Sequence, residues 1–393
     1  MGSSGLDVAR SLGRHGIPVV GVDFNPHAPG LKSRYCSSLL TQDPIEDPEG
    51  VLKILLTRGA QLSQKGILYP TSDEYLLFTS RYRRELSEYF LYAIPSEGIV
   101  ESMVNKRAQY ELAGKVGIPY PKTYFPESLH DAEAIKNEIE YPAFIKGYNS
   151  HLWWESFKNK GFRVQNPKQL IERYKQIFDM KVQALVQSLV MGPPSNVAIV
   201  CTYLSQKHQP SASFVARSLR RYPKDEGSNV TFKVSIHDEE LLQAALQFFQ
   251  GIDYRGVGQI NFKKDTRDGK YKLIELNARF WIGSIQATLA GINFPLIQYL
   301  DLTNQSIRRL KDYKDGVTWV DMIQDFRAFL ELHREGRFSL PDWLRSVSGA
   351  DCYAFFAWDD PKPFLKEIEQ TAWKVASAQK SQMSMLSLST RRL

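Results

Sequence analysis

The sequence predicts a mixed α/β (α+β) fold with a parallel sheet in its first part and antiparallel strands later. Helical and strand patterns alternate through roughly the first hundred residues, which is typical of parallel strands joined by crossover helices. Residues 197–204 and 211–217 then read as two strands in succession, and residues 258–279 read as a hairpin around Asp268-Gly269. Successive strands joined by short turns can pair antiparallel.

In the first part, apolar periodicity assigns each element in turn. The expected helices span residues 6–15, 50–59 and 74–90, and the expected strands span 18–23, 66–70 and 90–95. The chain begins inside a glycine-rich turn, Gly2 to Gly13, of the kind that normally follows a first strand. We therefore expect a Rossmann-like N-terminal domain whose first strand is lost or precedes a late start. The broken glycine motif argues against a nicotinamide oxidoreductase.

In the later part, the same reasoning assigns helices, strands and one long polar loop. We expect helices at 104–117, 167–178, 238–249 and 291–303, strands at 141–146 and 182–187, and a loop at 147–161. From about Ser377 onward the sequence predicts a frayed polar tail.

Composition limits the class of protein. The chain has 393 residues, 43% of them apolar and 24% charged, which indicates a globular protein of two or three domains. It shows no apolar run long enough for a membrane helix and no secretory signal. Its three cysteines are scattered, which predicts a reducing cytoplasm. The net charge of +7 is dispersed, so an anionic nucleotide is a better partner than nucleic acid.

The hairpin at 258–279 carries the most informative side chains. Strand side chains alternate between two faces. One face therefore holds Gln259, Asn261, Lys263, Glu275, Asn277 and Arg279. Carboxylate and amide oxygens suit Mg²⁺ that also holds phosphates, and a guanidinium suits a phosphate or carboxylate. The alternative is an ordinary solvated outer face.

Four phrases occur in a fixed order along the chain: Tyr141-Pro-Ala-Phe-Ile-Lys146, Ala184-Leu-Val-Gln-Ser-Leu-Val-Met-Gly192, Arg217-x-x-Arg220-x-x-Pro223, and Leu273-Ile-Glu-Leu-Asn-Ala-Arg279. In this order they resemble the ATP-grasp superfamily, and within it the carbamoyl-phosphate-synthase-like carboxylate–amine ligases of the D-aspartate ligase type. The resemblance covers about residues 1–310. It implies an ATP-grasp fold with an N-terminal preATP-grasp domain.

The resemblance also implies a reaction. A substrate carboxylate is phosphorylated by ATP with Mg²⁺, or Mn²⁺ in its place, and an amine then displaces phosphate to give an amide or peptide bond. Such chemistry needs positioning and charge neutralisation more than covalent help. The implied substrates are small carboxylates and amines, most naturally amino acids. No nucleic acid or membrane partner is expected, and a homodimer is left open.

By the same resemblance, individual residues receive roles. The residues expected to contact the nucleotide are Lys106, Lys146, Gln187, Ser188, Val190 and Asn196. Metal contacts fall to Glu275, Asn277 and Asn261. Arg279, Arg220 and Arg217 would bind the transferred phosphate or an anionic substrate. Residues 71–73 would face the acceptor, because sites lie beyond the carboxyl ends of strands in open α/β sheets.

The sequence departs from the family at several of these positions. Asn261 stands where relatives carry a carboxylate, which removes one negative charge; Gln259 would take its place if the register differed by two. The loop 147–161, expected to close over the phosphates, is poor in glycine and carries Trp153 and Trp154, which we interpret as anchors rather than substrate contacts. These departures keep open a catalytically weak, ATP-binding scaffold protein as the alternative function.

The implied domain organisation has four regions. These are a preATP-grasp domain at 1–103, a lid subdomain at 104–190, a catalytic subdomain at 191–310 and a C-terminal extension at 311–393. ATP would lie between the lid and the catalytic subdomain.

Overall fold

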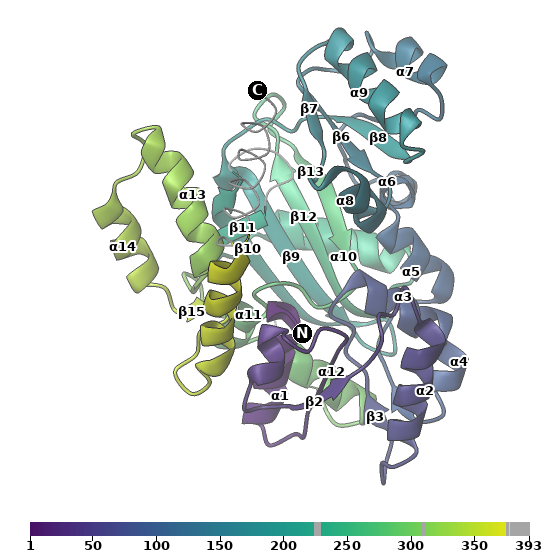
Figure 1. The fold of residues 1–393 in the computed structure, drawn as a ribbon, viewed down its shortest axis with the longest axis vertical. Helices are drawn as coiled ribbons and strands as arrows, with labels where there is room; N and C mark the ends of the chain where they lie inside the picture. Colours follow the sequence, from purple (N-terminus) through teal and green to yellow (C-terminus); the bar gives the residue numbers. More distant parts are fainter. Residues whose placement is uncertain (224–228, 308–311, 375–376, 378–393) are drawn as a thin grey trace, which may run out of the picture.

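The computed structural model describes residues 1–223, 229–307, 312–374 and 377. Within this part of the chain, a seven-stranded sheet forms the centre, with strand order β13-β12-β9-β10-β11-β14-β15 (Figure 1). Its strands are β9 (Val197–Leu204), β10 (Pro210–Tyr222), β11 (Asn229–Ser235), β12 (Gly256–Lys264), β13 (Tyr271–Asn277), β14 (Thr318–Val320) and β15 (Cys352–Tyr353). The antiparallel pairs predicted for 197–217 and 258–279 are confirmed.

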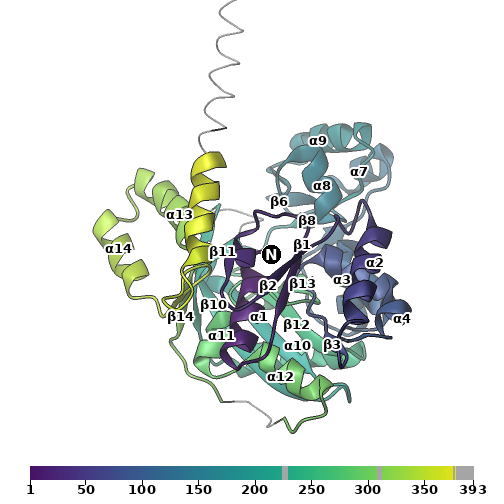
Figure 2. The same cartoon turned by 60° about the horizontal axis from the view of Figure 1, so that its bottom comes forward.

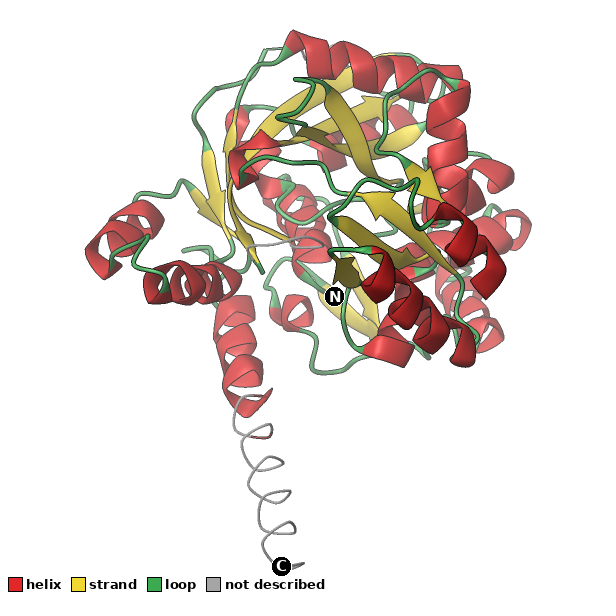
Figure 3. Ribbon diagram, turned by 90° about the horizontal axis from the view of Figure 1, so that it is seen from above, coloured by secondary structure: helices red, strands yellow, loops and turns green. Residues whose placement is uncertain are grey.

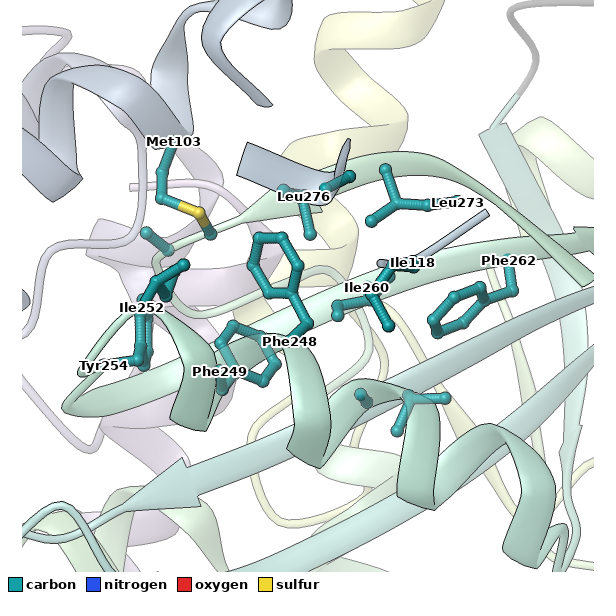
Figure 4. Packing of buried hydrophobic residues seen from close by; sticks show 14 of the residues in the cluster. Met103, Ile118, Phe248, Phe249, Ile252, Tyr254, Ile260, Phe262, Leu273 and Leu276 are labelled. Carbon is teal, nitrogen blue, oxygen red and sulfur yellow. The ribbon is translucent and has the colours of Figure 1, made fainter. Parts of the chain in front are cut away.

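The β12–β13 hairpin turns where the sequence predicts. Gly269 has a φ of +71°, a backbone conformation that suits glycine. Behind the hairpin, Phe248 and Phe249 of α10 (Glu239–Gly251) pack with Ile260 and Leu276 in one apolar core (Figure 4). Asp238 starts α10 by accepting a hydrogen bond from the Leu241 N–H. Because this core takes one face of the hairpin, the polar residues are left on the other.

A second, four-stranded sheet has the order β5-β8-β6-β7 in the described residues. Its strands are β5 (Thr123–Tyr124), β6 (Ala143–Gly147), β7 (Phe162–Val164) and β8 (Ala184–Ser188). With α7 (Leu129–Ile135), α8 (Ser150–Phe157) and α9 (Pro167–Asp179) it forms what we call the lid. The lid stands beside β12 and β13 in Figure 1. The predicted polar loop 147–161 is wrong in its middle, which is helical.

The N-terminal region consists of two short parallel strand pairs with helices. β1 (Val20–Asp23) pairs with β2 (Ser37–Leu40), and β3 (Gly66–Ile67) pairs with β4 (Phe90–Leu91). Parallel pairing is therefore confirmed, although the two pairs are separate sheets in the described chain. The helices are α1 (Ser3–Arg14), η1 (Pro29–Lys32), α2 (Pro48–Gly59), α3 (Asp73–Arg81) and α4 (Arg83–Leu86).

Two predicted helices are divided in the structure. The helix expected at 74–90 is split into α3 and α4 and ends at Leu86. The helix expected at 104–117 is α6 (Lys106–Lys115), preceded by a separate α5 (Glu97–Val104). Asn105 separates them, because its extended backbone ends α5 while its side chain accepts hydrogen bonds from the first N–H groups of α6. This cap places Lys106 at a helix start.

Helices α11 (Ile285–Ala290) and α12 (Phe294–Leu302) lie next to α1 below the large sheet (Figure 2). The large sheet carries helices on its outer sides, as the view from above shows (Figure 3). Together these helices bring the N-terminal region against the segment that follows the β12–β13 hairpin.

The C-terminal part adds strands as well as helices. β14 and β15 extend the large sheet, and between them lie α13 (Met322–Arg334) and α14 (Leu340–Ser348). Arg10 of α1 pairs with Asp360 at 3.0 Å, and both side chains are 1% exposed. The region expected to be an extension is thus built into the sheet and anchored on α1. The predicted polar tail lies, apart from Ser377, outside the described residues.

Candidate nucleotide and metal site

A cleft of about 870 Å³ lies between the lid, the β12–β13 hairpin and the N-terminal region. This volume is in the range of pockets that hold small molecules. The predicted site residues that line it are Lys106, Lys146, Gln187, Ser188, Val190, Asn261, Glu275, Asn277 and Arg279. The structure thus brings together most of the residues that the motifs selected, from four separate stretches of chain.

The polar face of the hairpin looks into this cleft, so the interpretation as a solvated outer face is wrong. Gln259 lies opposite Asn277, and Asn261 lies opposite Glu275. The Asn277 amide donates to Gln259 Oε1 at 2.9 Å, whereas the Asn261 amide donates to Glu275 Oε2 at 3.2 Å. The Gln259 oxygen is therefore engaged. Asn261 Oδ1, by contrast, is buried without a hydrogen-bond partner.

These atoms fit a hard cation. A carboxylate and the free amide oxygen of Asn261 lie side by side, with Asn277 two residues further along the same face. Mg²⁺ prefers such oxygen ligands and completes its shell with phosphates and water. In the described part of the chain no cluster of three or more His, Cys, Asp or Glu side chains forms a metal site. The fit thus depends on Glu275 as the carboxylate of the hairpin.

Glu275 lies among cations. Lys106 Nζ is 3.7 Å from Glu275 Oε1. Burial alone would raise the pKa of Glu275, but Lys106, Lys160, Lys146 and Arg279 outweigh it and hold this pKa below its usual value. Glu275 therefore stays ionised. A carboxylate surrounded by cations in a cleft suits phosphates that bring their own metal ion.

Lys146 is held at the end of β6 by two internal contacts. Its Nζ donates to the Tyr110 hydroxyl at 2.8 Å and to Gln187 Oε1 at 3.2 Å. Burial lowers the pKa of Lys146 to about 8. Gln187 also donates from Nε2 to Thr123 Oγ1 at 2.8 Å, so its side chain links Lys146 of β6 to β5. Gln187 is therefore engaged within the lid.

Two arginines assigned to the site do not reach the cleft, and both assignments are corrected. Arg220 Nη2 pairs at 2.7 Å with Asp325, a fully buried carboxylate on α13. Arg217 lies 3.6 Å from Asp238. Arg217 pairs with Val234, and Arg220 pairs with Phe232. The register shifts on both sides of Arg220 therefore put both arginines on the face of the sheet away from the cleft. Arg221, which received no role, lines the cleft instead.

Asn196 is a further correction. Its side-chain amide donates to the Lys264 carbonyl at 2.9 Å and is not among the residues that line the cleft. Val197, the next residue, lines it. Asn196 therefore supports the turn before β9, and its side chain is not placed to contact a ribose in the cleft.

At one end of the cleft the N-terminal region contacts the hairpin segment. Asp73 at the start of α3 accepts a hydrogen bond from Arg279 Nε at 2.8 Å, and both residues line the cleft. Of residues 71–73, which were expected to face the acceptor, Asp73 is the one that lines the cleft. The carboxylate fixes the guanidinium, which leaves part of its donor edge for an anion.

Sequence reasoning missed Lys233. It is buried on β11, lines the cleft, and donates to the carbonyl oxygens of Ile282 and Gly283 at 3.1 and 3.3 Å. Its ammonium lies 4.8 Å from the Trp319 ring centroid. The period-two pattern of residues 229–235 could have revealed it, because it puts Lys233 on the opposite face from Val230, Phe232 and Val234.

The two tryptophans of the lid behave differently. Trp153 is 1% exposed and packs against Phe157 and Phe162, so it is an anchor as expected. Trp154 is 51% exposed and lines the cleft, so the anchor interpretation is wrong for it.

Comparison with known proteins gives three results. No family model matches the chain. Over 255 residues it is 28% identical to D-aspartate ligase of Enterococcus faecium (strain Aus0004). That match spans 62% of this chain and 60% of the relative, which is less than two thirds of the relative's length.

Solved structures share the fold. An ADP complex of N5-carboxyaminoimidazole ribonucleotide synthetase has a TM-score of 0.65 at 13% identity and covers 88% of this chain and 83% of its own. The biotin carboxylase domain of Hydrogenobacter thermophilus 2-oxoglutarate carboxylase, in complex with MgADP, ADP and bicarbonate, has a TM-score of 0.63 at 15% identity, covering 81% and 71%. L-amino acid ligase from Bacillus licheniformis has a TM-score of 0.55 at 16% identity, covering 77% and 74%.

The predicted resemblance and fold are both confirmed. The chain is similar to D-aspartate ligase and has the ATP-grasp fold. In the part of the chain that the structure describes, no helix is long and apolar enough to cross a membrane.

Proposed function

We propose that this chain, with its ATP-grasp fold, is an ATP- and Mg²⁺-dependent ligase that joins a carboxylate to an amine. The observation that carries the proposal is the cleft around Glu275. There the ionised Glu275 carboxylate, the free Asn261 amide oxygen and several lysines converge. This set suits a nucleotide triphosphate and its metal ion, and few other small ligands carry that much negative charge.

The proposed reaction has two steps. A carboxylate oxygen of the first substrate attacks the terminal phosphorus of ATP, the bond to the β-phosphate oxygen breaks, and ADP leaves. The amine nitrogen then attacks the acyl carbon, the bond to the phosphate oxygen breaks, and the amine gives up a proton. The products are an amide or peptide bond, ADP and phosphate. Both steps are accelerated by positioning and by neutralising charge on the phosphate oxygens.

The residues divide this work between them. Lys106 and Lys146 hold the α- and β-phosphates, and the backbone of residues 187–190 borders the adenine. Glu275, Asn261 and Asn277 would hold Mg²⁺, which neutralises phosphate charge when bound. Arg279, fixed by Asp73, orients the carboxylate or the transferred phosphate.

Amino acids are the substrates that we propose, supported by the similarity to D-aspartate ligase. Mn²⁺ should replace Mg²⁺, since the ligands are oxygens. The division at residues 103, 190 and 310, the cytoplasmic location and a homodimer stay hypotheses. Proteolysis, localisation of a tagged chain and light scattering, respectively, would test them.

The second candidate is a nucleotide-binding scaffold that turns over slowly. The observation that favours it is Asn261, which leaves Glu275 as the one carboxylate at this position of the described hairpin. Against it stand the free Asn261 oxygen and the convergence of Lys106, Lys146 and Arg279, which a scaffold would not require.

One experiment separates the two candidates. ADP and phosphate release is measured with MgATP against pairs drawn from a panel of amino acids that includes D-aspartate. The ligase predicts release that requires both a carboxylate and an amine. Tight nucleotide binding without release in any pair would support the scaffold, and no nucleotide binding would refute both.

A further inference from the structure

The lid segment that was expected to be a flexible loop is instead held in a fixed shape. Asn149 Oδ1 accepts from the Leu152 N–H at the start of α8. At the other end, Asn159 Oδ1 accepts from the buried Trp153 indole N–H at 3.1 Å and from the Gly161 N–H at 2.9 Å. The two bonds of Asn159 fix the backbone around Lys160, which lies between Asn159 and Gly161.

Lys160 reaches from the lid across to the large sheet. Its Nζ donates to Asn229 Oδ1 at 2.6 Å, at the beginning of β11. Both residues line the cleft that also contains Lys106, Lys146 and Glu275. Lys160 is exposed as well as lining the cleft, so ligands from solution can reach it.

The charge of Lys160 acts on the same carboxylate as the other lysines. After Lys106 it is the cation that lowers the pKa of Glu275 most, ahead of Lys146. Desolvation in the cleft lowers the pKa of Lys160 itself, and Arg221 and Lys106 add to this, whereas Glu275 opposes it. An ammonium among like charges is stabilised by an anion placed between them.

The hairpin shows the complementary change. Asn261 stands opposite Glu275 at the position where the resemblance leads one to expect a second carboxylate. A divalent cation needs anionic oxygens, and this face has one carboxylate where two are expected. The chain has thus lost a negative charge at the metal position and carries a positive charge on the lid that faces the same space.

We propose that Lys160 is a phosphate-binding residue that contacts the terminal phosphate of ATP and takes the place of a second divalent cation. The site then operates with one metal ion per nucleotide, held by Glu275 and the Asn261 oxygen. The neutral Asn229 amide keeps the ammonium at the mouth of the cleft until the nucleotide enters. The inference rests on the proposed function and adds a residue and a metal count to it.

The test compares Lys160→Met with Lys158→Met. Lys158 lies in the same segment, is exposed and does not line the cleft, so it is a matched control. Affinities for the Mg²⁺ complexes of ADP and of a non-hydrolysable ATP analogue are measured by calorimetry. A charge-assisted contact to the terminal phosphate predicts that Lys160→Met weakens the analogue by about tenfold or more and ADP by much less. Lys158→Met should change neither.

Metal stoichiometry gives the second readout. Bound Mn²⁺ is counted by electron paramagnetic resonance in the presence of the ATP analogue. The expected values are one ion in the unaltered protein and two in the Lys160→Met/Asn261→Asp double variant. Two ions in the unaltered protein, or equal weakening of ADP and the analogue in Lys160→Met, would overturn the proposal.

The outcomes distinguish this inference from the proposed function. Unaltered affinity for the analogue in Lys160→Met would remove Lys160 from the phosphates and leave the ligase intact. Absence of nucleotide binding in the unaltered protein would refute the ligase itself. Thermal melting of each variant shows whether it is folded, and Lys160→Gln, which keeps a polar group of similar length, replaces Lys160→Met if that variant unfolds.

Discussion

The β12–β13 hairpin and the end of β10 both carry motifs that the sequence assigned to the site, yet the motif arginines of β10, Arg217 and Arg220, do not line the cleft. In the hairpin, regular pairing keeps Asn261 and Glu275 opposite each other on one face. In β10, register shifts turn Arg220 toward α13, where it pairs with Asp325. Polar motif residues therefore line the cleft in the hairpin, whereas Arg220 of β10 forms an internal ion pair.

The difference teaches that a motif on a strand can be carried over only where the alternation is unbroken. Side-chain direction follows a period of two in a regular strand, and a bulge shifts it by one residue. Arg217, Arg220 and Pro223 were grouped by a spacing of three, and the register shifts of β10 put both arginines on the face away from the cleft. The hairpin residues were grouped by a spacing of two, and they share a face.

The largest expected effect is on the hairpin side. Glu275→Gln should lower turnover by at least about 100-fold, because the metal ion would lose its carboxylate ligand. Thermal melting should change little. The control is Glu240→Gln on α10, an exposed residue that does not line the cleft. Unchanged turnover in Glu275→Gln would contradict the site.

For β10, the largest expected effect is a loss of folding stability when Arg220 is replaced. Arg220→Ala leaves the fully buried Asp325 carboxylate without its ion pair, which should cost about 3–5 kcal/mol in the free energy of unfolding. Arg221→Ala, one residue along, should instead weaken substrate or nucleotide binding with little loss of stability. Urea unfolding and steady-state kinetics on both variants make the comparison. If Arg220→Ala kept its stability and lost nucleotide affinity, the correction would be wrong.

The next expected effect concerns pH. Burial lowers the pKa of Lys146 to about 8, so the free protein loses this charge as the pH rises through that value. Phosphates favour the charged form, so binding above pH 8 takes up a proton, and nucleotide affinity should fall by up to about tenfold per pH unit.

The lowered pKa of Lys146 has the opposite effect on folding stability, which should increase as the pH rises. Because the folded pKa lies below the unfolded one, the cost of burying the charged lysine is present below pH 8. The free energy of unfolding should therefore rise between pH 8 and the ordinary lysine range. Calorimetry in buffers of different ionisation enthalpy measures the proton uptake, and Lys146→Arg, which stays charged, should remove it. Uptake that persists in Lys146→Arg would point to another group.

The smallest expected effect is a gain in affinity for Mg²⁺. Asn261→Asp adds a carboxylate beside Glu275, so Mg²⁺ should bind tighter by several-fold, on the order of one kcal/mol. The Mg²⁺ concentration for half-maximal nucleotide binding reports it. Gln259→Glu is the companion variant, since the Gln259 oxygen is engaged by Asn277 and should gain less. Equal gains at both positions would mean that Asn261 has no privileged place in the metal shell.

The sequence predicted well wherever local pattern determines geometry. Lys146 follows an apolar strand, and the hairpin residues alternate around an Asp-Gly turn, so their directions could be inferred from the sequence. Asp73 could be expected to lie near the cleft because it follows a strand end. These inferences needed only the order of elements and the faces of strands.

The rest depends on contacts between distant parts of the chain. Asp325, which forms the ion pair with Arg220, is 105 residues away in the sequence, and no local pattern connects the two. Lys160 lies in the segment 147–161 that was predicted to be a polar loop, and its place depends on the packing of Trp153 and on Asn229. The helix α8 itself was missed, since its polar residues suggested a loop although Asn149 caps it.

The most direct test of the central claim follows the oxygen atoms. The carboxylate substrate that supports ADP release is labelled with oxygen-18, and the phosphate formed is analysed by mass spectrometry. An acyl-phosphate route transfers one labelled oxygen from the carboxylate to the phosphate, and this is the result that the proposed ligase predicts. Phosphate that carries label only from the solvent would mean that water attacks the nucleotide, which would contradict the ligase.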